Sequence, residues 1–113
     1  MDATSSEKGQ TVDIPGIPGP QQQRLLDVLI QQADVDAIWL FGSRAMGRER
    51  PGSDIDLCVD AARLTHLDRL RLMADIDELL LPWTVDLALL HELPPDLLSH
   101  VQRVGRCLWT RSK

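Results

Sequence analysis

Hydrophobic positions change period along the chain, and these changes separate predicted helices from predicted strands. Leucine and isoleucine recur at helical spacing over 20–33, which predicts a first helix. Residues 35–41 are rich in β-forming types and 54–59 alternate with period two, so both are predicted strands. The glycine-containing loop 42–53 joins them, with a short helical turn expected after Ser43.

The second half of the chain repeats this change of period. Thr65 and Asp68 resemble a capping box and predict the start of a long helix that ends before Pro82. A strand at 85–89, a helix at 95–104 and a short strand at 107–110 follow, which predicts an α+β fold: a small sheet with helices mainly on one face. The apolar face predicted for the long helix is Leu67, Leu70, Met73, Ile76, Leu79 and Leu80.

The first twenty residues differ from the rest in composition. They hold three of the seven prolines and three of the seven glycines and contain no Leu, Phe or Trp, so too little apolar surface is available to offset the entropy lost on ordering. We therefore expect a flexible arm at 1–20 and one domain at 21–113.

Composition limits the function classes. A chain of 113 residues with 43% hydrophobic and 26% charged residues is typical of one soluble domain, without a membrane span. The formal charge of -5 argues against direct binding of nucleic acid by broad phosphate neutralisation. Only two cysteines occur and no signal peptide is recognisable, so a cytoplasmic location is expected.

Three aspartates are candidates for a metal site. Asp54 and Asp56 lie two apart on a predicted strand and share a face, and Asp86 lies opposite the apolar face of another strand. Adjacent carboxylates repel each other unless a cation lies between them, and their hard oxygens suit Mg²⁺. The pattern predicts a two-metal site of the kind used in phosphoryl or nucleotidyl transfer.

The loop before these aspartates is suited to phosphate. A helix that starts at Ser43 would point backbone N–H groups at an incoming phosphate, and Gly42 allows close approach. Arg44, Arg48 and Arg50 add local positive charge, although Arg44 could instead pair with an acid of the protein itself.

These residues together resemble a known family. Gly42 and Ser43, ten further residues, and then Asp54-Ile55-Asp56 are similar to the signature of the minimal nucleotidyltransferases in the DNA polymerase beta superfamily. The resemblance implies a polymerase beta palm-like fold with a mixed sheet. Met46 departs from the pattern, because many members have an arginine there.

The resemblance also implies a role for each residue. Two Mg²⁺ ions would be held by the three acids, and ATP would be attacked at its α-phosphorus, with the acceptor's proton taken by Asp86 or a metal-bound hydroxide. The implied catalytic and metal-binding residues are Asp54, Asp56 and Asp86. The implied nucleotide-binding residues are Gly42, Ser43, Arg44 and Ser53.

The family resemblance further implies a partner. Minimal nucleotidyltransferases typically act as antitoxins that move AMP from ATP onto a HEPN-domain ribonuclease toxin, usually on tyrosine, and we expect such a hetero-oligomer here. The size of the chain suits a catalytic palm without an acceptor-binding domain. Two alternatives stay open: a catalytically silent module that neutralises its partner by contact, and an enzyme that modifies a small molecule such as an aminoglycoside.

Overall fold

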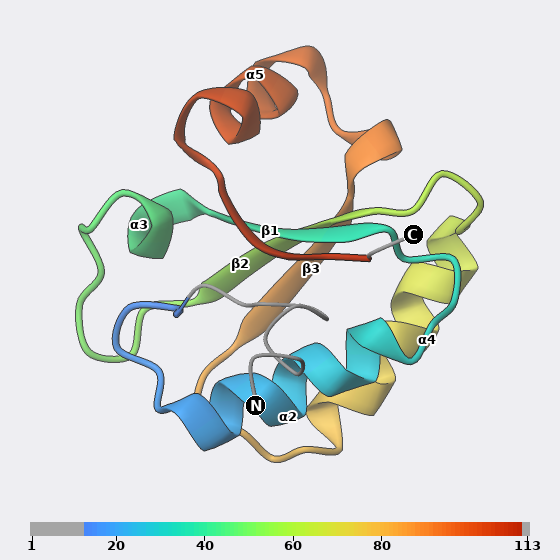
Figure 1. Ribbon diagram of the computed structural model, residues 1–113. Coiled ribbons are helices and arrows are strands. Elements are labelled where there is room, and N and C mark those ends of the chain that lie inside the picture. Colours follow the sequence, from blue (N-terminus) through green and yellow to red (C-terminus); the bar gives the residue numbers. More distant parts are fainter. Residues whose placement is uncertain (1–12, 112–113) are drawn as a thin grey trace, which may run out of the picture.

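A four-stranded mixed sheet forms the centre of the molecule in the computed structural model, which describes residues 13–111 (Figure 1). The strand order is β3-β2-β1-β4. Strand β1 (Ala37–Phe41) pairs antiparallel with β2 (Ile55–Asp60) and with β4 (Arg106–Thr110), whereas β3 (Val85–Leu89) lies parallel to β2. All four strands predicted from the sequence are present, and the mixed sheet confirms the predicted fold class.

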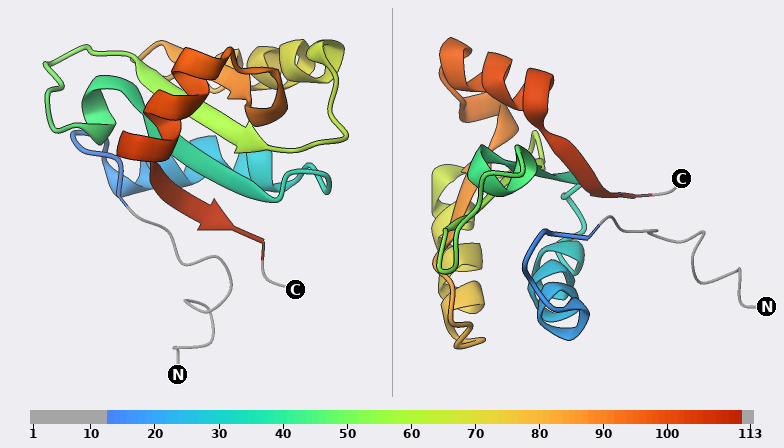
Figure 2. Two further views of the ribbon diagram at one scale, coloured as in Figure 1. Left: turned by 90° about the horizontal axis from the view of Figure 1, so that it is seen from above. Right: turned by 90° about the vertical axis from the view of Figure 1, so that its left-hand side faces the viewer.

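Helices lie on both faces of the sheet, but unequally. Helices α2 (Gly19–Ile30) and α4 (His66–Asp77) cover one face, and α5 (Pro95–Val104) crosses the other (Figures 1 and 2). Because β2 and β3 are parallel, the chain must cross over between them, and α4 makes this connection. The short helix α3 (Gly42–Ala45) follows β1 directly, and one 3₁₀ turn, η1 (Leu90–Glu92), follows β3.

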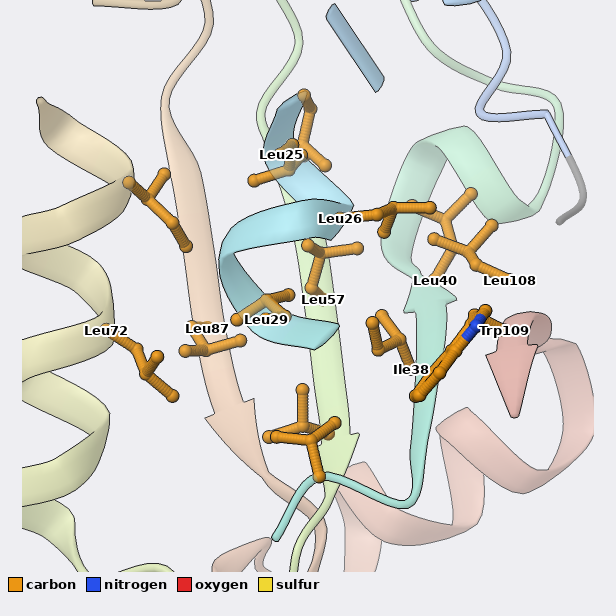
Figure 3. Close-up of a cluster of buried hydrophobic side chains, with 14 of the residues drawn as sticks. Leu25, Leu26, Leu29, Ile38, Leu40, Leu57, Leu72, Leu87, Leu108 and Trp109 are labelled. Carbon is orange, nitrogen blue, oxygen red and sulfur yellow. The ribbon is translucent and has the colours of Figure 1, made fainter. Parts of the chain in front are cut away.

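The core lies between the sheet and the α2–α4 layer. Leu25, Leu26 and Leu29 of α2 are completely buried over the strands (Figure 3). Apolar residues of all four strands meet them, alternating along β1, β2 and β3 as the sequence predicts, whereas β4 contributes two consecutive residues. The strand residues in this cluster are Ile38, Leu40, Ile55, Leu57, Val59, Leu87, Leu89, Leu108 and Trp109.

The face that α4 buries differs from the prediction. Ile76 is buried as predicted, and Leu72, which was not part of the predicted face, is buried too. Leu67 and Leu70 are 56% and 45% exposed. The helix carries two leucine-containing stripes at helical spacing. Its packing beside β3, with Arg69 donating a hydrogen bond to the Leu87 carbonyl, turns only one stripe inward. The prediction for Leu67 and Leu70 was wrong because periodicity alone does not choose between two such stripes. The prediction for Leu80 was also wrong, because α4 ends at Asp77 and Leu80, which follows it, is 86% exposed.

The segment before α2 is part of the packed structure. Ile14 and Ile17, which the sequence analysis places in a flexible arm, are 1% and 8% exposed and belong to the core cluster. The Ile14 amide donates a 2.7 Å hydrogen bond to the side-chain oxygen of Gln22. Residues 1–12 lie outside the described part of the chain, so the expectation of an arm there stays a prediction.

Candidate active site

Strand register brings the three candidate aspartates together. Asp56 of β2 lies directly opposite Asp86 of the parallel strand β3, and Asp54 precedes β2 by one residue. Alternation turns the side chains of Asp56 and Asp86 to the sheet face opposite the leucine core, as expected from the sequence. Asp54 and Asp86 are exposed and Asp56 is half-buried, so the acids form a cluster open to solvent at one end of the sheet.

The cluster holds uncompensated negative charge. Burial raises the pKa of Asp56 to about 6, with further contributions from repulsion by Asp86 and then by Asp54, and from a hydrogen bond with Asp86 that favours the protonated form. The positive charge of Arg44 opposes this shift only in part. The site therefore favours a cation or a proton among these carboxylates.

The Gly-Ser turn lies against the same cluster. Phe41, the last residue of β1, pairs with Asp56, so the chain enters α3 beside this carboxyl group. Gly42 adopts φ +74°, and a Cβ atom there would collide with Oδ2 of Asp56 and lie 3.1 Å from its Cγ. The glycine is thus required by the position of the acid as well as by its backbone conformation.

The first turn of α3 lies beside the carboxyl group of Asp56. The N-cap residue Phe41 provides no side-chain cap, and the first amides of any helix have no partner within the helix. The carbonyl of Ser43 accepts hydrogen bonds from the amides of Met46 and Arg48, which closes the turn tightly. Gly42 and Ser43 are therefore in position to present backbone donors next to Asp56.

Arg44 and Ser53 lie on the inner side of the loop. The Arg44 side chain is 2% exposed, and its guanidinium group donates hydrogen bonds to the carbonyls of Ser53 and Pro15. The Ser53 hydroxyl accepts a 2.8 Å hydrogen bond from the amide of Arg50. Arg48 and Arg50 are exposed, so the positive charge that reaches solvent from this loop comes from them and not from Arg44. Met46 is exposed as well.

The donor set fits Mg²⁺, although the carboxylates do not stand in a ligand arrangement. Among residues 13–111, no three His, Cys, Asp or Glu side chains converge as metal ligands. Asp56 and Asp86 instead lie close enough to share a hydrogen bond. Hard carboxylate oxygens with excess negative charge are what Mg²⁺ selects, and a bound cation would relieve the repulsion among these carboxylates.

Cys58 shares the sheet face of the aspartates but is not a candidate nucleophile. It is completely buried, and burial, together with the charge of Asp60, raises the pKa of its thiol to about 12. A thiol with such a pKa is protonated at neutral pH and unreactive.

Sequence reasoning missed two groups that frame this site. The Phe41 ring makes an edge contact with His100 of α5 at a centroid distance of 6.4 Å, so α5 forms a wall beside the Gly-Ser turn. On the other side, Pro15 and Gly16 lie against Arg44. A Pro-Gly pair between two isoleucines is the only sequence signal for the second group.

The polymerase beta nucleotidyltransferase family model matches residues 23–113, which includes the Gly-Ser turn and all three acids. The chain belongs to this family.

Within the described residues, no helix is long and apolar enough to cross a membrane.

One named relative is similar to part of this chain. The Haemophilus influenzae protein named "Probable protein adenylyltransferase MntA" is 36% identical over 69 residues, which are 59% of this chain and 60% of that protein. The chain thus matches less than two thirds of this relative's length.

Two solved complexes contain similar folds. A toxin-antitoxin with AMP-PNP matches at 29% identity and a TM-score of 0.67, over 85% of this chain and 76% of the other. A complex of tri-AMPylated Shewanella oneidensis HEPN toxin with its MNT antitoxin matches at 27% identity and a TM-score of 0.64, over 80% and 71% of the two chains.

Proposed function

We propose that this chain is an Mg²⁺-dependent protein adenylyltransferase that moves AMP from ATP onto a hydroxyl group of a HEPN toxin. The proposed acceptor is a tyrosine side chain. The chain would act as the antitoxin of that pair. The observation that carries the proposal is the placement of Asp56 between Asp86 and Gly42, because it puts a carboxylate cluster and a phosphate-suited turn side by side. Three similar proteins support the choice of nucleotide and acceptor: a probable protein adenylyltransferase, a toxin-antitoxin with AMP-PNP, and an MNT antitoxin in complex with an AMPylated HEPN toxin.

The proposed chemistry follows from this placement. Asp54, Asp56 and Asp86 would hold two Mg²⁺ ions, which supply neutralisation of charge on the phosphate oxygens. Backbone donors of Gly42 and Ser43 hold the phosphates in line, and Ser53 borders them from the loop. Asp86 is exposed on the edge strand, so we assign it the proton of the attacking hydroxyl group. The hydroxyl oxygen forms a bond to the α-phosphorus of ATP while the bond from that phosphorus to the β-phosphate oxygen breaks, and pyrophosphate leaves.

Transfer of label from ATP to a co-purified HEPN protein tests the proposal. We expect label from [α-³²P]ATP on the partner with the wild-type chain and Mg²⁺. Asp54→Asn and Asp86→Asn should each lower the rate by about 100-fold or more, the usual effect of losing a positioned acid or base. Asp60→Asn is the matched control, because it makes the same change on the same face of β2 but at the opposite end of the strand.

Two outcomes would contradict the proposal. Transfer by Asp86→Asn at the wild-type rate with saturating Mg²⁺ would remove this acid from the site. Absence of label on the partner together with label on an aminoglycoside would place the chain among the enzymes that modify small molecules.

A further inference from the structure

Arg44 joins three backbone segments that are distant in the sequence. Its Nε and Nη2 donate to the Ser53 carbonyl at 3.2 and 2.6 Å, and its Nη1 donates to the Pro15 carbonyl at 2.7 Å. The side chain is 2% exposed. All three donating nitrogens of the guanidinium group thus point at backbone oxygen atoms of the protein.

Two of these segments carry the proposed chemistry. Arg44 lies within α3, whose first residues are Gly42 and Ser43, and its acceptor Ser53 immediately precedes Asp54. The Arg44 side chain therefore connects the two ends of loop 42–53, and its hydrogen bonds link the Gly-Ser turn to the residue before Asp54. Arginine suits this role because its planar fork donates in fixed directions.

The third segment lies before the residues that the family model matches. That match starts at residue 23, whereas Pro15 and Gly16 lie in the packed segment held by Ile14 and Ile17. Gly16 has φ +81°, and a Cβ atom there would lie 2.9 Å from Nη1 of Arg44. The turn at Gly16 is thus shaped around the guanidinium group.

We infer that Arg44 is a positioning residue and that the segment 13–17 is part of the active-site scaffold of this chain. The Pro15 carbonyl accepts a hydrogen bond from the guanidinium group and so fixes its position. The guanidinium group in turn fixes Ser53, and with it the neighbouring Asp54, relative to the Gly-Ser turn. This inference rests on the proposed function, and it assigns to Arg44 support of the loop in place of contact with the nucleotide.

Steady-state transfer kinetics separate the two roles. For Arg44→Lys and Arg44→Met we expect kcat to fall about 10- to 100-fold, because small displacements of reacting groups have effects of this size, with KM for ATP within about twofold of wild type. A residue that contacts the phosphates would raise KM for ATP instead. Arg44→Lys should keep more activity than Arg44→Met, since an ammonium group can still donate to one of the carbonyls.

Gly16→Ala tests the same link from its far end and keeps Arg44. We expect kcat to fall several-fold, and we expect no additional fall when Gly16→Ala is added to Arg44→Met, because both changes act through one contact. Gly19→Ala is the control from the same segment, since a Cβ atom there meets no atom within 4 Å. Gly47→Ala is the control for backbone strain, because its φ of +72° is close to that of Gly16 and a Cβ atom there also meets no atom within 4 Å. The kcat of both controls should equal that of wild type.

Amide hydrogen exchange provides a measurement that does not depend on activity. Residues 50–54 should exchange faster in Gly16→Ala than in wild type, while Gly19→Ala leaves them unchanged. If the wild-type chain transfers AMP and the Arg44 variants change only in KM for ATP, the inference is overturned and the proposed function remains. If the wild-type chain transfers nothing, the proposed function fails, and unchanged exchange at 50–54 in Gly16→Ala would overturn the inference as well.

Discussion

The charged carboxylate of Asp56 carries a cost that folding must overcome, from its burial first and then from repulsion by Asp86 and Asp54. Its pKa is raised above the unfolded value of 3.8 to about 6, because the folded protein favours the protonated carboxyl group. The cost to stability is therefore complete above pH 6 and shrinks as the pH falls from 6 toward 3.8. We expect Asp56→Asn to melt at a higher temperature than wild type at pH 7.5 without divalent cations, with the difference narrowing at pH 4.5.

Mg²⁺ gives this prediction a second measurement. A cation among the carboxylates relieves the same repulsion, so Mg²⁺ should raise the melting temperature of wild type more than that of Asp56→Asn. A variant that melts below wild type by the same margin at both pH values would show that Asp56 stabilises the fold and would contradict the prediction.

Alanine variants of Gly42 and Gly47 distinguish the effect of backbone strain from that of a collision with Asp56. Both have positive φ angles, +74° and +72°, but a Cβ atom at Gly47 meets nothing within 4 Å, whereas one at Gly42 meets Asp56. Each change to alanine should cost about 1 kcal/mol of unfolding free energy for the left-handed backbone. We expect Gly42→Ala to lose transfer activity in addition, measured as kcat at saturating ATP. Equal kcat values for the two variants would remove the Asp56 contact from the argument.

Single residues also show where sequence reasoning succeeds and where it stops. The positions of Asp56 and Asp86 on one face follow from strand alternation, which is a local rule. The placement of Arg44 could not be obtained in this way, because its acceptors lie 29 residues before it and 9 residues after it. Whether a charged side chain of this loop points to solvent or into the protein depends on such long-range acceptors.

At the scale of elements, local signals placed the helices and strands well but not their packing. The capping box at Thr65 and Asp68 is present, and it fixes the start of α4. The inward stripe of α4 depends on its contacts with β3 and α2, which no local pattern specifies. The same holds for Ile14 and Ile17, which a Pro- and Gly-rich composition hides although both are buried.

The two stripes of α4 can be distinguished by stability. Leu72→Ala removes a side chain that is 6% exposed and should cost about 2 to 4 kcal/mol in unfolding free energy. Leu67→Gln and Leu70→Gln change exposed side chains and should stay within about 0.5 kcal/mol of wild type. Denaturant unfolding measures all three, and a large loss for Leu67→Gln would show that this stripe is covered in solution.

At the scale of the whole molecule, Asp56 and Asp86 lie on the sheet face opposite the leucine core. Helix α5 crosses that face, whereas α2 and α4 cover the other (Figure 2). A partner that presents a hydroxyl group to this face would meet both the acids and the helix wall. The formal charge of -5 would suit the proposed HEPN partner if its RNA-binding surface is basic, and we expect such association to slow as salt rises. In the proposed function, contact and chemistry would each contribute to neutralising that partner.

The double variant Asp54→Asn/Asp56→Asn separates contact from chemistry. It keeps the fold and the surface around the site, so we expect it to co-purify with the HEPN protein of its source organism as wild type does. After the complexes are dissociated, partner from the wild-type complex should carry added adenylyl mass and stay inactive as a ribonuclease, while partner from the variant complex recovers activity. Full recovery from both complexes, with no added mass, would show that inhibition depends on occupancy alone and would support the contact-only module.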